Sequence, residues 1–310
     1  MINRLRQIKT NSVLWIHIDR PTEHEIQYLR DSFEFHPLDL EDCMNTAQRP
    51  KVDEYSKYIF LVLLFPFYDR RERTIHAAEL DFFVGPNYVI TVSDGKHEIV
   101  DRLFADCLKS EVFRERFMAQ SPAHLLFEIL DRLQTGIFPM LDHISQDIVD
   151  IERQVFSGAE KRMVRDILLI KRNIVNFRRI VNAHKSTIKK LMDIHKHGIF
   201  SLSSNLAVYF GYILDRSKDI WEILENHKET INAFQEANDS LITFKLNEIM
   251  KILTAISVSI LPATLVASLF GMNIGGAPFI GNPFGFWILT VAMMIISVFL
   301  IGYFKKKDWL

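Results

Sequence analysis

The sequence predicts an α+β domain built on a mixed sheet, followed by a long stalk helix and two transmembrane helices. Three observations lead to this fold class. Apolar, β-rich runs alternate with helical patterns up to residue 118, and the pattern after Ser121-Pro122 is almost entirely helical. From Ile252 to Phe304 the chain has no Asp, Glu, Lys or Arg, although charged residues make up 24% of the whole sequence.

We expect the first domain to comprise residues 1–118. Gly85-Pro86-Asn87 separates two runs of strand-forming residues and predicts a β-hairpin there. Helical patterns lie before, between and after the strands. The expected strands are 13–18, 58–65, 79–84 and 88–93, and the expected helices are 22–32, 37–44 and 96–118.

A helical part follows, in which Ser121 is an N-cap residue and Pro122 a helix-starting proline. We expect Pro139 to kink the first of three helices. The third helix would be about 100 Å long at about 1.5 Å per residue. The predicted helices are 122–156, 160–196 and 202–270, which place a helical hairpin at 119–200 and a cytoplasmic stalk helix at 201–248.

Two stretches, which together cover nearly all of this charge-free segment, are long enough to cross a bilayer, since a helix needs about 20 apolar residues to do so. They are 249–271 and 284–304, joined by an external loop, 272–283, that is rich in Gly, Pro and Asn. A buried hairpin of a soluble core is the alternative. Lysines flank both spans and the loop carries no charge, so we expect a multi-pass protein of the cell membrane with both termini cytoplasmic.

One face of the first span carries mostly small and hydroxyl-bearing side chains, and we call it the polar face. Close helix packing and a water-lined path both fit this composition. Amides at Asn247 and Asn273, near the two ends, favour a pore. Because two helices cannot enclose a conduit, a ring of chains is predicted. The polar face consists of Asn247, Met250, Thr254, Ser257, Leu261, Thr264, Ser268 and Gly271.

Several other function classes lack support in the sequence. The formal net charge of −1 gives no reason to expect a nucleic-acid partner. Cys43 and Cys107 show neither metal-site spacing nor a disulfide framework. There is no glycine-rich phosphate loop, zinc-protease motif or nucleophile elbow. We therefore expect a protein that is not an enzyme and has no cofactor.

Three segments carry a resemblance to a known family. The sequence Phe270-Gly271-Met272-Asn273, directly after the first span, resembles the YGMN signature of the CorA metal-ion transporters. The ending YFKKKDWL, residues 303–310, is similar to the end of that family. Residues 36–63, HPLDLEDCMNTAQRPKVDEYSKYIFLVL, are similar to a segment of its soluble domain.

The resemblance implies a homopentamer with a funnel-shaped cytoplasmic domain that transports a divalent metal ion, most simply Mg²⁺. It assigns pore-lining positions to Asn247, Met250, Leu253, Leu261 and Thr264. It also implies an outer ion-binding site at Gly271, Met272 and Asn273, where Asn273 is the metal-binding side chain, and a basic collar at Lys305, Lys306 and Lys307 on the cytoplasmic tail, 305–310.

Three departures from the family pattern keep alternatives open. Phe270 replaces the signature Tyr. The loop lacks the acidic sequence common in magnesium-transporting members, and its Gly275-Gly276 is more similar to the zinc-transporting, ZntB-like branch. Tyr212 stands near the family's regulatory aspartate, so Asp69 and Asp215 become candidate regulatory metal ligands.

The resulting expectation is uptake of Mg²⁺, and also of Co²⁺ or Ni²⁺, down the electrochemical gradient. Two alternatives remain. One is a Zn²⁺ transporter of the same superfamily, and the other is a membrane-tethered cytoplasmic metal sensor or scaffold. The expected partners are the metal ion, membrane lipid and further copies of the chain.

Overall fold

The computed structural model describes residues 4–45, 49–155, 160–194, 204–272, 284–307 and 309. The chain divides into two compact units, Met1–Gln235 and Glu236–Leu310. Helix α8 (Ser204–Gly271) contributes residues to both units. The predicted domain boundaries, including those of the stalk at 201–248, stay predictions.

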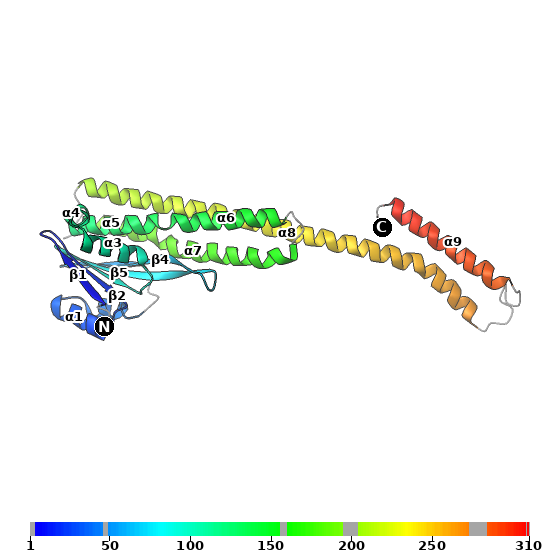
Figure 1. The fold of residues 1–310 in the computed structure, drawn as a ribbon, viewed down its shortest axis with the longest axis horizontal. Coiled ribbons are helices and arrows are strands. Elements are labelled where there is room, and N and C mark those ends of the chain that lie inside the picture. Colours follow the sequence, from blue (N-terminus) through cyan, green and yellow to red (C-terminus); the bar gives the residue numbers. More distant parts are fainter. Residues whose placement is uncertain are drawn as a thin grey trace. The chain divides into compact units, whose positions relative to one another are not determined.

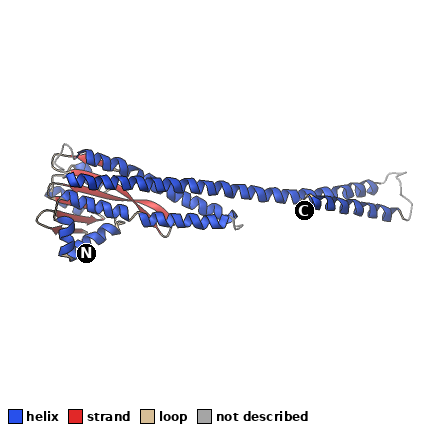
Figure 2. Cartoon of the chain, turned by 90° about the horizontal axis from the view of Figure 1, so that it is seen from above, coloured by secondary structure: helices blue, strands red, loops and turns tan. Residues whose placement is uncertain are grey.

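A six-stranded mixed sheet forms the centre of the first unit (Figures 1 and 2). The strand order is β1-β2-β6-β5-β4-β3, and only the β2–β6 pair is parallel among the pairs of this sheet. The strands are β1 (Leu5–Lys9), β2 (Leu14–Asp19), β3 (Lys51–Glu54), β4 (Ile59–Asp69), β5 (Thr74–Val84) and β6 (Tyr88–Ser93).

All four predicted strands are present, and the predicted hairpin at Gly85-Pro86-Asn87 joins β5 to β6. Sequence reasoning missed β1 and β3. Both are short strands at the two edges of the sheet, where charged side chains interrupt the apolar pattern. Edge strands tolerate such residues because one side of the strand has no neighbour in the sheet.

Helices cover both faces of the sheet. Helices α1 (Glu23–Ser32) and α2 (Pro37–Asp42) pack on one face, where Ile26, Leu29 and Leu40 join a core with sheet residues such as Phe60 and Phe83. Helices α5 (Pro122–Thr135) and α7 (Glu160–Ile194) contact strands of the sheet. Helix α3 (Glu98–Lys109) packs against α5. The sheet therefore positions polar residues of its central strands between two helical layers.

Each of two predicted helices is divided into two shorter helices in the structure. The helix expected at 96–118 breaks at Ser110, whose backbone is extended, into α3 and α4 (Glu111–Met118). The helix expected at 122–156 breaks after Gly136 into α5 and α6 (Phe138–Val155). Pro139 therefore lies in the first turn of α6, where its missing N–H costs no hydrogen bond, and it does not kink a longer helix.

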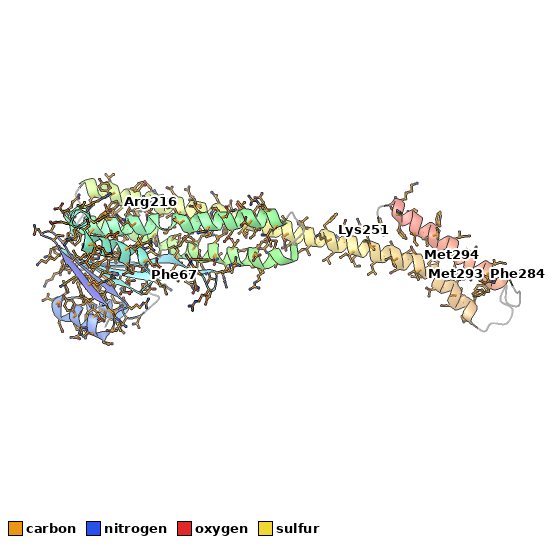
Figure 3. All side chains as sticks on the ribbon, viewed as in Figure 1. Phe67, Arg216, Lys251, Phe284, Met293 and Met294 are labelled. Atoms are coloured by element: carbon orange, nitrogen blue, oxygen red, sulfur yellow. The ribbon has the colours of Figure 1, made fainter. Side chains whose placement is uncertain are left out.

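Polar contacts join α5 and α6 to the first part of α8. Arg216, labelled in Figure 3, forms an ion pair of 2.7 Å with Asp131. Gln134 Nε2 donates to Ser217 Oγ at 2.7 Å, and both residues are buried. Arg178 of α7 (Glu160–Ile194) also forms an ion pair with Glu225 of α8.

The second unit consists mainly of the end of α8 and of α9 (Gly285–Lys306), which form an antiparallel hairpin in Figures 1 and 2. Both helices contain stretches long and apolar enough to cross a membrane. Only 11% and 6% of the most apolar windows of α8 and α9 are buried. A core helix of a soluble protein would be mostly buried, so the exposure favours membrane helices.

Candidate functional site

The membrane part of α8 has one face that packs against α9. Ala255 and Ser259 are buried there, and Pro262, Ala263 and Val266 are half-buried. The hydroxyl of Ser297 on α9 donates to the main-chain oxygen of Ser259 at 3.3 Å. The half-buried positions of α9 recur at helical spacing, at Leu289, Met293, Ser297, Leu300 and Phe304.

The polar face lies on the opposite side of α8. At about 100° per residue, its positions from Met250 to Gly271 point roughly a third to a half of a turn away from the mean direction of Ala255 and Ser259. All eight of its members are exposed in the single chain, and so is Leu253. The polar face therefore does not pack against the chain's own second span. It is available to water or to neighbouring chains, and its pore-lining role stays a prediction.

The hydroxyl groups of the polar face are oriented by the helix itself. Thr254 Oγ1 donates to the main-chain oxygen of Met250 at 2.7 Å, and Ser257 Oγ donates to that of Leu253 at 2.8 Å. Thr264 Oγ1 makes the same bond to Ile260 at 3.2 Å. Since each hydroxyl has one proton and two lone pairs, the outward side of each oxygen is a hydrogen-bond acceptor.

The predicted outer site lies at the C-terminal end of α8. The helix ends at Gly271, and the next residue, Met272, is 53% exposed. Asn273 and the rest of the predicted loop up to residue 283 lie outside the described residues. The last carbonyls of a helix have no partners within it and carry partial negative charge. This end of α8 is therefore electrostatically suited to a cation.

The predicted basic collar lies at the end of α9. Lys305 and Lys306 occupy its last turn and Lys307 is its C-cap, and all three are exposed. Their charges complement the negative end of the helix dipole. Trp309 stacks on Phe304, with ring centroids 5.6 Å apart. Lys251 of α8, labelled in Figure 3, is also exposed, just before the charge-free segment begins.

The two candidate regulatory aspartates are engaged separately. Asp69 caps the turn after β4, where the backbone N–H groups of Arg71 and Glu72 lower the pKa of its carboxyl. Asp215 forms an exposed ion pair of 2.6 Å with Lys218. Within the described part of the chain, no three His, Cys, Asp or Glu side chains are arranged to hold a metal ion. Neither aspartate thus belongs to a preformed metal site in the single chain.

Sequence reasoning separated the polar face from the rest of α8 but did not find the role of Ser259. This serine faces α9, and its hydroxyl donates to the Ala255 main-chain oxygen at 2.7 Å. The available signal was its position, since Ser259 lies off the face that carries Ser257.

Comparison with known proteins gives a consistent result. The model of the family described as CorA-like Mg²⁺ transporter protein matches residues 10–306. The cobalt/magnesium transport protein CorA of Thermotoga maritima is 26% identical, over 100% of this chain and 90% of its own length. The structure of the CorA magnesium transporter of Methanocaldococcus jannaschii superposes with a TM-score of 0.83 at 18% identity, covering 98% of this chain and 93% of its own.

A third similarity concerns the fold of the soluble part. The ZntB cytoplasmic domain of Vibrio parahaemolyticus superposes with a TM-score of 0.62 at 13% identity, covering 76% of this chain and 89% of its own. These structural comparisons confirm the predicted fold class, with a mixed α/β domain, a long helix and a second apolar helix.

Proposed function

The chain belongs to the CorA-like Mg²⁺ transporter family, and we propose that it forms a membrane channel through which divalent cations, above all Mg²⁺, enter the cell down the electrochemical gradient. Relatives over nearly the full length are named as cobalt and magnesium transport proteins. The proposal places both termini in the cytoplasm, because lysines flank both spans.

The observation that carries the proposal is the two-sided character of α8. One side packs on α9, and the other side presents the polar face without covering from its own chain. Lipid-facing helices have no need for such a face. Since one hairpin cannot enclose a path, we propose a ring of chains around the polar faces, with five subunits as the family resemblance implies.

The chemistry of this face suits a hydrated dication. Mg²⁺ gives up its water reluctantly and prefers oxygen ligands. Bound waters direct their hydrogens away from the metal, so they need acceptors such as the outward lone pairs of Thr254, Ser257 and Thr264. We propose Asn273 and the last carbonyls of α8 as the outer ion-binding site. Met250, Leu253 and Leu261 would form an apolar constriction that dewets when narrow.

The membrane potential supplies the driving force for uptake. Moving one charge across the membrane is worth about 2.3 kcal/mol per 100 mV, and a dication gains twice as much. The lysines of the basic collar, Lys305, Lys306 and Lys307, would repel a cation that leaves the pore beside them. An exit there requires the chains to hold these side chains away from the pore axis or to screen them with anions.

The first test is ion-resolved flux through the purified protein in proteoliposomes. We expect Mg²⁺ uptake to rise with an inside-negative potential. We also expect excess Mg²⁺ to suppress the uptake of other divalent cations. Zinc uptake that ignores millimolar Mg²⁺ would support the zinc alternative instead. Intact oligomers that carry no metal current would support the tethered sensor or scaffold.

A second test compares the two faces of α8 through a matched pair of serines. In Ser257→Cys, a hydrophilic thiol reagent is expected to label the chain and to reduce Mg²⁺ flux about tenfold or more, because a bulky adduct would occupy the path. In Ser259→Cys, labelling is expected to be slow, since Ser259 is 3% exposed. The unsubstituted protein, which contains half-buried Cys43 and buried Cys107, is the control for labelling of the native thiols. Faster labelling at Ser259→Cys would contradict the proposed arrangement.

A further inference from the structure

Two exposed stripes of side chains run along the helices of the first unit, a basic one on α7 and an acidic one on α8. In each stripe the steps between residues alternate between three and four, which is the spacing at which one helix packs along another. All the members of both stripes are exposed in the single chain. The basic stripe consists of Arg165, Leu168, Arg172, Val175, Arg179 and Asn182, and the acidic stripe of Asp215, Asp219, Glu222, Asn226, Glu229 and Ala233.

The opposite side of each helix is covered within the chain. On α7, Ile174 and Phe177 are fully buried, and the helix contacts β3, β4 and β5. On α8, Phe210 and Ile220 are fully buried. At about 100° per residue, each stripe points nearly half a turn away from these buried residues. The two stripes are therefore the surfaces that α7 and α8 leave for contacts outside the chain.

Most charges of the two stripes have no ion pair in the described part of the chain. Asp215 is paired, with Lys218. Leu168 and Val175 lie between the arginines and are 53% and 50% exposed. Apolar side chains that alternate with arginines along one surface are typical of a protein interface. The charged residues without an ion pair are Arg165, Arg172 and Arg179 on α7, and Asp219, Glu222 and Glu229 on α8.

Contacts between other residues fix the direction of the two helices. Arg178 of α7 pairs with Glu225 of α8, and Lys171 Nζ donates to Gln235 Oε1 at 3.0 Å. Earlier residues of α7 thus lie beside later residues of α8, so the helices run antiparallel. A cyclic ring relates neighbouring chains by rotation without translation. In such a ring, α8 of the next chain keeps the height of the chain's own α8 and is also antiparallel to α7.

We propose that the basic stripe of each chain packs against the acidic stripe of the next chain in the ring. Two different surfaces of the same chain meet in this contact, as closure of a ring of more than two chains requires. The inference rests on the ring proposed above and adds to it the helix faces that meet. It does not depend on which ion is carried.

The seven-residue repeat makes the contact cooperative along its length. Arg165, Arg172 and Arg179 are seven residues apart, as Glu222 and Glu229 are. One antiparallel alignment therefore brings several opposite charges together. A single exposed ion pair contributes only about 0–1 kcal/mol, so the pairs matter through their number and by selecting the surface that the neighbour presents.

The test reverses the charges of the stripes in the full-length protein in detergent. Light scattering gives the mass of the assembly. Energy transfer between rings labelled with donor and acceptor dyes at the N-terminus gives the rate of subunit exchange. The basic-reversed variant carries Arg165→Glu, Arg172→Glu and Arg179→Glu, the acid-reversed variant carries Asp219→Arg, Glu222→Arg and Glu229→Arg, and the combined variant carries all six.

Each reversed variant is expected to dissociate or to exchange subunits about tenfold faster or more, because like charges then face each other. The combined variant is expected to return to within about threefold of the unsubstituted rate, since its stripes again carry opposite charges. At about 1 M salt the differences are expected to shrink, because the screening length falls to about 3 Å from about 10 Å at 0.1 M.

The control carries Arg30→Glu, Arg70→Glu and Lys109→Glu, which change the net charge equally at exposed positions outside α7 and α8. Its exchange rate is expected to stay unchanged. Unchanged exchange in both reversed variants would overturn the contact, and so would a combined variant that exchanges as fast as either. Acceleration in the basic-reversed variant alone would assign the basic stripe to a different anionic partner and overturn it too. An unsubstituted protein with the mass of one chain would overturn the ring itself.

Discussion

Replacing Asn273 with alanine is expected to reduce Mg²⁺ flux in proteoliposomes about 100-fold or more. Each subunit would lose a side-chain carbonyl that accepts hydrogen bonds from the waters of the entering ion. One such hydrogen bond is worth about 1 kcal/mol, and the loss is repeated in every subunit of the ring. The measurement is the initial rate of Mg²⁺ entry under a fixed inside-negative potential.

The matched control is Asn282→Ala, the same substitution in the same predicted loop but outside the tripeptide. We expect this variant to conduct at close to the rate of the unsubstituted protein. Flux that is equally low in both variants would indicate damage to the loop as a whole. Flux that survives in Asn273→Ala would remove the proposed role of the outer site while leaving the fold untouched.

Replacing Phe83 with alanine is expected to cost about 3–5 kcal/mol of folding free energy in the soluble domain. Phe83 is fully buried under α1 and α2, and its ring centroid lies 4.2 Å from that of Phe35 and 4.6 Å from that of Phe60. Its removal would leave a cavity in the core on that face of the sheet. The measurement is the midpoint of thermal unfolding of the full-length protein in detergent.

Phe113→Ala serves as the comparison, because Phe113 is 39% exposed on α4. Its truncation removes less buried area, so a much smaller shift of the unfolding midpoint is expected. Equal shifts for the two variants would show that the core of Phe35, Phe60 and Phe83 does not limit the stability of the domain.

Long, strongly periodic segments were predictable from the sequence, and short charged ones were not. The helices expected at 160–196 and 202–270 occur as α7 and α8. The expected end at 270 lies one residue before the observed end at Gly271, and the expected residues 195, 196, 202 and 203 lie outside the described residues. Strands β1 and β3 were missed because their side chains do not alternate cleanly. Each of them pairs with the next strand along the chain, β1 with β2 and β3 with β4, and this pairing places it at an edge of the sheet.

The breaks inside two predicted helices depended on local backbone conformation. The sequence 96–118 is compatible with one helix, and the break at Ser110 appears where α3 and α4 turn to pack separately. At Gly136 the chain similarly ends α5 and begins α6. Propensity alone is a weak guide in such places because packing overrides it.

The candidate site was likewise predictable from the sequence only in part. Helical periodicity was enough to group the polar face, since Ser257, Leu261 and Thr264 share one side of any α-helix. The sequence contained no information on which side would meet α9. The acids of β5 show the opposite case, because ELD within an apolar run does not reveal that Asp81 would border a cavity beside Cys43.

By itself, the sequence determined the membrane hairpin, the long helix that leads into it and the family to which the chain belongs. Those features depend on local composition, on helical period and on short motifs. Only the tertiary structure decided that the polar face points away from α9, and that Glu79 and Asp81 line a pocket. Both outcomes depend on which surfaces meet when distant segments pack, and burial there is set by neighbours that a local pattern does not specify.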